Sequence, residues 1–198
     1  MPMMILGIDP GLHATGYGVI TAEPDCLRLV AAGAVRPSAR RPLAQRLQQL
    51  YDGLQQVMGA HRPQVVAIES LYTHQQYLTT AALMAHARGV ACLLAAQHGL
   101  PLIEYLPTRI KKALTGYGAA SKDQVARAVG MWLTVNPSSW ASDVTDALAL
   151  AIAHAHISRV NGAVPALTKV RRRPRRAPPQ GVAEEVPRAK LEGRAVAL

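Results

Sequence analysis

Two short apolar runs in this chain each end in a carboxylate. Residues 3–8 lead into Asp9, and residues 65–68 lead into Glu69. Runs this short and this apolar are typical of strands that are covered on both faces of a sheet. An ionised carboxylate is rarely placed in apolar surroundings without a partner, because it loses its hydration there. We therefore expect a buried sheet with carboxylates at the ends of its strands, where a bound cation would offset their burial.

A second pair of carboxylates, Asp143 and Asp146, opens the apolar helical run 147–157. They are three residues apart and so share a helix face in the first turn, where the macrodipole favours negative charge. Helix capping would explain this pair about as well, and Asp9 alone could be a turn residue. Glu69 fits neither explanation, because Glu is a poor strand and turn residue. Together, the four favour a shared site for Mg²⁺ or Mn²⁺.

The pattern of apolar residues predicts a single α/β domain. Three closely spaced strands suggest an antiparallel meander, and the glycines of the second indicate close backbone approach or a bulge. Helices then alternate with two further short strands. The expected strands are 3–9, 15–21, 27–35, 65–69 and 102–105. The expected helices are 43–58, 76–97, 107–114, about ten residues after Ser121, and a last helix that Ser142 caps and that runs to 159.

The order of the strands suggests how the acidic residues could act together. If the first and fourth strands are neighbours, Asp9 and Glu69 project from adjacent carboxyl ends, where open α/β sheets place their sites. The last helix could bring Asp143 and Asp146 to the same edge. Four carboxylates there would hold two divalent ions about 4 Å apart, which activate a water on one side of a phosphodiester and stabilise the leaving oxygen on the other.

Charge points to a polyanionic partner and divides the chain. The 198 residues carry 22 Lys and Arg against 12 Asp and Glu, a net charge of +10. Residues 161–198 hold 9 of the basic and 3 of the acidic residues and lack periodicity. We expect a folded domain over 1–160 and a basic, disordered tail over 161–198.

Cysteine use and the apolar pattern suggest a cytoplasmic protein with no membrane contact. Cys26 and Cys92 lie far apart without metal-type spacing, which fits a reducing compartment. The N-terminus lacks the features of a signal peptide, and no apolar stretch reaches the roughly 18 residues of a membrane span.

Three blocks of the chain resemble the RuvC family of Holliday-junction resolvases. They are Leu6-Gly7-Ile8-Asp9-Pro10-Gly11 with Thr15-Gly16-Tyr17-Gly18-Val19-Ile20, then Ala67-Ile68-Glu69 with Ala87-Arg88-Gly89-Val90-Ala91, and Asp143-x-x-Asp146-Ala147-Leu148-Ala149-Leu150-Ala151-Ile152. The resemblance implies a ribonuclease-H-like fold, with a mixed five-stranded sheet flanked by helices. It also implies a homodimer, Mg²⁺-dependent endonuclease activity on four-way DNA junctions in recombination and repair, and partnership with the RuvA–RuvB branch-migration complex. Mn²⁺ is expected to substitute for Mg²⁺.

The resemblance also implies roles for single residues. Asp9 would lie between the two metal ions, Glu69 would hold one of them and orient the attacking water, and the last two carboxylates would complete the shell. Basic residues near the scissile phosphate match Lys111 and Lys122, whereas Lys112 is expected to be an ordinary solvated lysine.

Two further residues are expected to contact DNA. Arg88 lies in the second matching block. Tyr72 falls in the loop after Glu69, where many relatives carry an aromatic residue that wedges into the junction. The block here departs from the usual pattern with Phe, so a Tyr72 that stacks on a base and a buried loop tyrosine both remain open.

Other classes of protein explain less of the sequence. An actin-like sugar kinase or ATPase needs a second domain and a glycine-rich adenosine loop, and a non-catalytic basic module leaves the carboxylates unexplained. A ribonuclease-H-like nuclease acting on RNA or RNA–DNA hybrid is the main alternative. His154 and His156 are two residues apart and do not share a helix face, so we expect solvated or capping roles for them.

Overall fold

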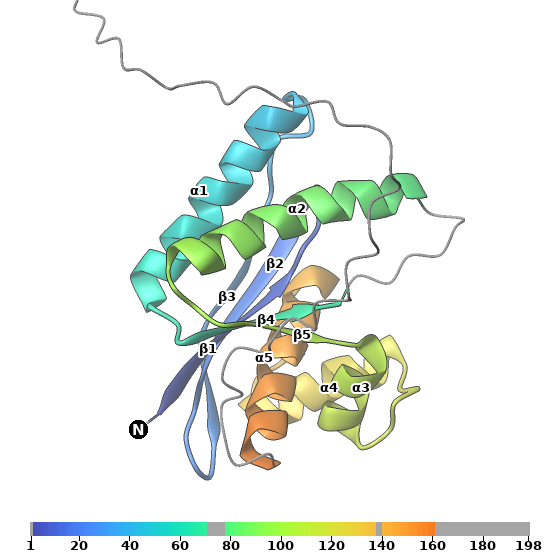
Figure 1. Cartoon of the computed structure of the whole chain (residues 1–198). Coiled ribbons are helices and arrows are strands. Elements are labelled where there is room, and N and C mark those ends of the chain that lie inside the picture. The colour runs from blue at the N-terminus through green and yellow to red at the C-terminus, as the bar shows by residue number, and fades with distance from the viewer. Residues whose placement is uncertain (1, 71–77, 138–139, 161–198) are drawn as a thin grey trace, which may run out of the picture. The chain divides into compact units, whose positions relative to one another are not determined.

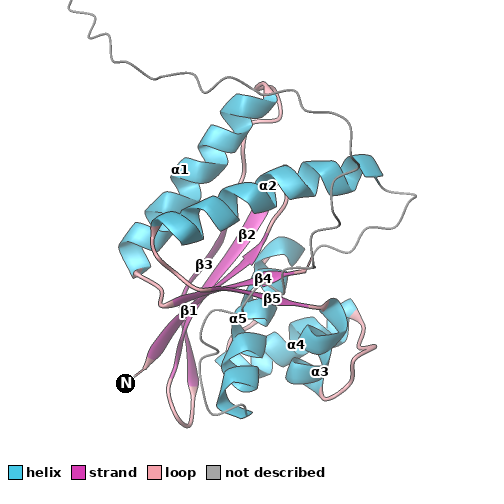
Figure 2. Cartoon of the chain, viewed as in Figure 1, coloured by secondary structure: helices cyan, strands magenta, loops and turns pink. Residues whose placement is uncertain are grey.

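The computed structural model of the chain describes residues 2–70, 78–137 and 140–160 (Figure 1). Within these ranges the strands and helices alternate as the sequence predicts, and Figure 2 separates them by colour. In chain order they are β1 (Met3–Asp9), β2 (Thr15–Ala22), β3 (Leu27–Val35), α1 (Leu43–His61), β4 (Val65–Glu69), α2 (Leu78–Gln97), β5 (Leu102–Tyr105), α3 (Pro107–Thr115), α4 (Lys122–Leu133) and α5 (Ser142–Val160).

The strands form one mixed sheet in the order β3-β2-β1-β4-β5. The first three strands pair antiparallel, which confirms the predicted meander, and β4 and β5 continue the sheet in parallel. The register of β2 against β3 shifts between Val19 and Ile20, as the glycine-rich second strand suggested. The sheet therefore places β1 and β4, the two strands that end in carboxylates, side by side.

Helices cover both faces of the sheet, with α1 and α2 on one side and α3, α4 and α5 on the other (Figure 1). Alternate residues of β1 serve the two layers, because successive side chains of a strand point to opposite faces. Leu6 and Ile8 pack into the cluster with α1 and α2, and Ile5 packs into the cluster with α5. Burial on both faces explains why β1 and β4 are continuously apolar.

Glycines let α5 lie directly on the sheet. A Cβ atom built on Gly7 would lie 2.0 Å from the backbone oxygen of Ala147, and one built on Gly16 would lie 1.9 Å from that of Asp143. Real Cβ atoms do not approach backbone atoms so closely, so a side chain at either position would push the helix away. This approach confirms the expectation drawn from the glycines of the second strand, and it fixes the height of Asp143 above the sheet.

Two predicted helix boundaries are wrong. Helix α1 continues past Gly59 to His61, and Arg62 ends it in a left-handed conformation, with φ at 45° and its N–H donated to the Met58 carbonyl. Pro63 follows and disfavours a further helical turn. Ser142 is the first residue of α5 instead of its cap. In contrast, Ser121 caps α4 as predicted, in a reciprocal capping box with Gln124.

The prediction of solvated or capping roles for the two histidines of α5 is wrong for His154, whereas His156 makes a capping contact with the last turn of α3. His154 is completely buried and hydrogen-bonds through Nδ1 to the Tyr105 hydroxyl at 2.8 Å. His156 is partly buried, donates from Nδ1 to the Ala113 carbonyl at 3.0 Å and packs its ring against Trp132. Both residues therefore join α5 to its neighbours β5, α3 and α4 in place of meeting solvent.

Some predictions fall outside the described residues. Tyr72 and the segment 161–198 are not described, so the wedge and the tail stay predictions. Over the part of the chain that is described, no helix is both long and apolar enough to span a membrane.

Candidate active site

Asp9 and Glu69 lie next to each other at the carboxyl edge of the sheet. Strands β1 and β4 run parallel with Ile8 opposite Ile68, so the carboxylates that end the two strands lie at the same level. Ile8 and Ile68 point into the cluster with α1 and α2. The next residue of each strand therefore faces the other layer, which contains α5. Both carboxylates are only partly exposed.

The first turn of α5 brings the second pair of carboxylates to this edge. Gly16 pairs with Asp9 across β1 and β2, and it also lies directly beneath the backbone of Asp143. Asp146 follows one turn later on the same face of the helix. The charges of Asp146, Glu69 and Asp143 all act on Asp9, so the structure brings the four predicted carboxylates into one cluster.

Burial and mutual repulsion make this cluster hard to ionise. Burial first, and then the charges of Asp146, Glu69 and Asp143, raise the pKa of Asp9 to about 7 from 3.8. Burial and the Asp146 charge raise the pKa of Glu69. Burial also raises the pKa of Asp146. Desolvation in company with like charges is the pattern expected where a site awaits a positive partner.

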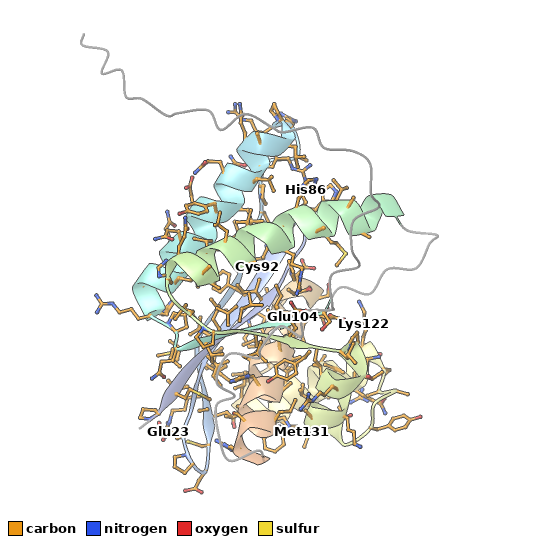
Figure 3. The ribbon with its side chains drawn as sticks, viewed as in Figure 1. Glu23, His86, Cys92, Glu104, Lys122 and Met131 are labelled. Atoms are coloured by element: carbon orange, nitrogen blue, oxygen red, sulfur yellow. The ribbon has the colours of Figure 1, made fainter. Side chains whose placement is uncertain are left out.

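Two lysines supply part of that positive charge. Lys122, at the start of α4, lowers the pKa of Asp9, Glu69 and Asp146, and Figure 3 shows where this side chain lies. Lys111, on α3, lowers the pKa of Glu69 and Asp146. The structure thus brings both predicted lysines near the carboxylates. Lys112 is exposed, as expected for a solvated lysine.

The donor atoms of the cluster suit a hard divalent cation. All four side chains offer carboxylate oxygens, which are the ligands that Mg²⁺ and Mn²⁺ prefer. Among the described residues, however, no three Asp, Glu, His or Cys side chains are already grouped closely enough to hold a metal ion. The charges of the other three carboxylates nonetheless act on Asp9. The residues therefore fit a divalent metal, and the raised pKa of Asp9 is the observation that supports this fit.

The loop after Asp9 is held by residues that the sequence did not single out. Thr15 is completely buried, donates from Oγ1 to the Gly11 carbonyl at 2.7 Å and accepts the N–H of Gly11 at 3.2 Å. Arg46 of α1 reaches the same loop and donates to the Leu12 carbonyl at 2.9 Å. A polar residue at the first position of an apolar strand was the only signal for Thr15, and Arg46 gave none.

Arg88 does not lie on the surface as a DNA contact would require. Only 10% of its side chain is exposed, and its guanidinium binds the Glu69 carbonyl and the Glu104 carboxylate. The guanidinium is thus engaged by groups of the protein itself, so the geometry favours a structural role over the DNA-binding role expected from the sequence.

Comparison with known proteins gives one family. The profile of the family "Crossover junction endodeoxyribonuclease RuvC" matches residues 5–154. A protein of that name from Rhodopirellula baltica is 44% identical over 148 residues, which cover 75% of this chain and 83% of the relative. Another from Halorhodospira halophila is 45% identical over 152 residues, which cover 77% of this chain and 89% of the relative.

Solved structures agree with the sequence relatives. The fold matches T. thermophilus RuvC in complex with a Holliday junction substrate, with a TM-score of 0.76 and 32% identity over 83% of this chain and 99% of that one. The yeast mitochondrial Holliday junction resolvase Ydc2 matches with a TM-score of 0.58 at 13% identity, over 78% of each chain, which shows a shared fold only.

Proposed function

Because the chain belongs to the RuvC family of crossover junction endodeoxyribonucleases, we propose that it resolves four-way DNA junctions by metal-dependent cleavage of phosphodiester bonds in recombination and repair. The match to a relative solved with its Holliday junction substrate supports junction DNA as the substrate. An enzyme that acts on RNA or RNA–DNA hybrid is the less favoured alternative, since every relative described above is a junction enzyme.

The observation that carries this proposal is the carboxylate cluster at the edge of β1 and β4. Asp9, Glu69, Asp143 and Asp146 would hold two Mg²⁺ ions, for which Mn²⁺ would substitute. Metal ions bound there would supply an activated water and stabilise the leaving oxygen. The raised pKa of Asp9, from burial and three neighbouring carboxylates, supports a site that favours a bound cation.

The lysines have a separate role in this proposal. Four carboxylates would repel DNA, so basic groups must offset both their charge and that of the scissile phosphate. Lys111 and Lys122 stand beside the cluster on α3 and α4, where an ammonium group would stabilise negative charge that develops on the phosphate. Tyr72 would stack on a junction base.

We further propose that the enzyme acts as a homodimer, because a two-fold dimer presents two active sites to a two-fold junction and makes paired nicks. The outer face of α2 supports this. Leu93 is 52% exposed there, and a Cβ atom at Gly89 would meet nothing within 4 Å. Figure 3 shows His86 on the same helix, on the side away from the sheet. A cytoplasmic location and partnership with the RuvA–RuvB complex follow from the family resemblance.

One assay tests the proposed activity. Purified protein is incubated with a synthetic four-way junction, a linear duplex and an RNA–DNA hybrid, each with Mg²⁺, with Mn²⁺ or with EDTA. We expect symmetric paired nicks in the junction only, and only with metal. Cleavage of the hybrid in preference to the junction would instead support the alternative, and cleavage in EDTA would exclude the metal site.

A second experiment tests the division into a nuclease domain over 1–160 and a basic tail over 161–198. Deletion of 161–198 removes a net charge of +6, so it should weaken binding to junction and duplex alike and make the dependence of affinity on salt shallower. Metal dependence and junction preference should persist. Loss of catalysis at saturating DNA would mean that the tail takes part in cleavage and that the domain boundary is drawn wrongly.

A further inference from the structure

Arg88 of α2 approaches Glu69 from the side opposite its carboxylate. The guanidinium Nη1 donates to the Glu69 backbone carbonyl at 2.5 Å, and Nη2 lies 2.6 Å from Oε1 of Glu104. The side chain of Glu69 faces the other way, toward Asp146 and Lys111. The backbone of Glu69 is thus bound from the α2 side of the sheet, while its carboxylate lies on the α5 side.

The pairing of β4 with β5 explains how these groups meet. Ile68 lies opposite Glu104, so both side chains point toward α2, and Glu69 lies opposite Tyr105, so both point toward α5. Beyond the strand, the N–H of Ser70 donates to the Tyr105 carbonyl at 2.8 Å. The peptide between Glu69 and Ser70 is therefore held at both ends, by Arg88 through its oxygen and by β5 through its nitrogen.

We propose that Arg88 is a positioning residue for cleavage, which fixes the Glu69–Ser70 peptide and thereby aims the Glu69 carboxylate at the metal site. The inference rests on the proposed function, because the orientation of the Glu69 carboxylate matters for cleavage only if that carboxylate binds a metal ion. We call Arg88, its partner Glu104 and the Glu69 carbonyl that Arg88 binds the clamp.

The chemistry of the clamp favours arginine over other cations. A guanidinium offers several donors in a fixed plane, so it can bind a carbonyl and a carboxylate at once, whereas an ammonium is a point charge on a flexible stem. Glu104 neutralises Arg88, which is 8% exposed and would otherwise be a buried unpaired charge. The cations that act on the Glu69 carboxylate are Lys111 and Lys122, so Arg88 works through geometry.

The location of the clamp also explains why the carboxylate needs it. Glu69 is the last residue of β4, so beyond it no further pairing of β4 with β1 holds the backbone. A carboxylate at the end of a strand can swing with its peptide. Groups that orient metal ligands from behind typically change metal affinity or activity about 10- to 100-fold when they are lost.

The test uses three variants of the full chain. Arg88→Met keeps the length of the side chain without its donors, Arg88→Lys keeps the charge, and Glu104→Gln keeps an acceptor oxygen without the charge. Arg159→Met is the matched control. Arg159 also donates to backbone carbonyls, those of Glu23 and Cys26, but Figure 3 shows Glu23 far from Lys122 and the site.

Four quantities are measured for each variant. They are kcat for a four-way junction with Mg²⁺, junction affinity in EDTA, Mn²⁺ affinity without DNA by electron paramagnetic resonance, and hydrogen exchange at the Ser70 amide. We expect Arg88→Met to lower kcat and Mn²⁺ affinity about 10- to 100-fold, to speed Ser70 exchange and to leave junction affinity within about 2-fold. Arg88→Lys should recover part of the loss.

Glu104→Gln keeps the test decisive if Arg88→Met does not fold. The Glu104 side chain is 52% exposed, so its replacement leaves the core intact, and we expect kcat to fall about 5-fold, the effect of roughly one hydrogen bond. Arg159→Met should change none of the four quantities.

Several outcomes would overturn the clamp. Unchanged kcat and Mn²⁺ affinity in Arg88→Met would do so, and so would an equal loss of kcat in Arg159→Met. Loss of junction affinity alone would return Arg88 to the DNA-binding role. If the wild type binds Mn²⁺ but cuts no junction, the proposed function fails, whereas Mn²⁺ affinity and Ser70 exchange still decide the clamp.

Discussion

The two halves of α5 bury ionisable groups with opposite consequences. At its N-terminal end, Asp146 adds to the burial that raises the pKa of Asp9 to about 7. Further along the helix, burial lowers the pKa of His154 to about 4. In both places the apolar surroundings favour the uncharged form. The difference lies in the neighbours, since Asp9 faces like charges and His154 faces the Tyr105 hydroxyl.

The comparison separates a structural polar group from a functional one. A neutral imidazole that hydrogen-bonds to a hydroxyl through Nδ1 contributes to the packing of α5 against β5 and carries no charge that needs a counter-ion. Carboxylates that raise one another's pKa destabilise the protein whenever they ionise, unless a cation joins them. The end of α5 where like charges meet therefore marks the site of chemistry, and the end where the imidazole stays neutral marks the core.

The largest expected effect is loss of cleavage when the cluster is dismantled. Replacement of one carboxylate by its amide, in Asp9→Asn, Glu69→Gln, Asp143→Asn or Asp146→Asn, should lower the cleavage rate by about 1,000-fold or more, as for residues that act as a unit. Junction affinity in EDTA should persist, because binding rests on basic groups. Rates on a labelled four-way junction and gel-shift affinities measure the two effects.

Asp25→Asn is the matched control for these four variants. Asp25 is exposed in the turn between β2 and β3, so the Asp25→Asn enzyme should cut at the wild-type rate. A cluster variant that also cuts near that rate would remove its residue from the site.

The next effect is on stability and follows from the raised pKa of Asp9. Its folded value of about 7 exceeds the unfolded 3.8, so the folded state holds this proton more tightly. The resulting stabilisation is complete below pH 3.8 and is lost as pH rises to 7, by up to about 4 kcal/mol. In EDTA, the stability of Asp9→Asn relative to wild type should therefore grow from pH 4 to 7, as measured by urea unfolding. Mg²⁺ at pH 8 should stabilise wild type more than the variant.

His154 should give the mirror image of that result. Its folded pKa of about 4 lies below the unfolded 6.5, so its stabilising effect is complete above pH 6.5 and is lost as pH falls toward 4, by up to about 3 kcal/mol. His154→Asn cannot gain a proton there. Its stability relative to wild type should grow as pH falls, opposite to Asp9→Asn. If the stability of both variants relative to wild type changed in the same direction with pH, the contrast between the two halves of α5 would be refuted.

A smaller effect is expected from the lysines beside the cluster. Lys111→Ala and Lys122→Ala should each slow cleavage about 10- to 100-fold while junction affinity falls less, if the ammonium stabilises charge on the scissile phosphate. Single-turnover rates at saturating DNA separate the two quantities. Lys112→Ala, an exposed neighbour, should change neither. Equal losses of rate and affinity would mean that the lysines only anchor phosphates.

Short-range patterns explain why the sequence predicted the carboxylate edge. Continuous apolar runs identified β1 and β4 as central strands, and the residue that follows such a run must leave the sheet at its edge. The glycines of β2 predicted a close backbone approach or a bulge, but not that α5 is the element that approaches. These features depend on neighbouring residues in the chain, so they are visible in the sequence without knowledge of the fold.

Contacts between distant elements could not be predicted in the same way. Arg88 was expected at DNA because its block resembled a family motif, yet its surroundings come from β4 and β5. His154 was expected to have a solvated or capping role, because spacing on one helix says nothing about a hydroxyl on another strand. In both cases a polar residue is buried by a partner far along the chain, and only the sheet order reveals that partner.

The smallest expected effect tests the core end of α5, where His154 lies. Tyr105→Phe removes the hydroxyl that binds His154 and leaves the imidazole with no partner for Nδ1, while Nε2 already lacks one among the described residues. The loss of one buried hydrogen bond should reduce the free energy of unfolding by about 1–2 kcal/mol. A phenyl ring can still receive the Arg109 cation, so the rest of the packing remains. His154 lies eight residues beyond Asp146, about 12 Å along the helix, so cleavage should change less than about 2-fold. A 10-fold loss of rate at nearly unchanged stability would mean that this pair also sets the position of the carboxylates, and that the two halves of α5 are not independent.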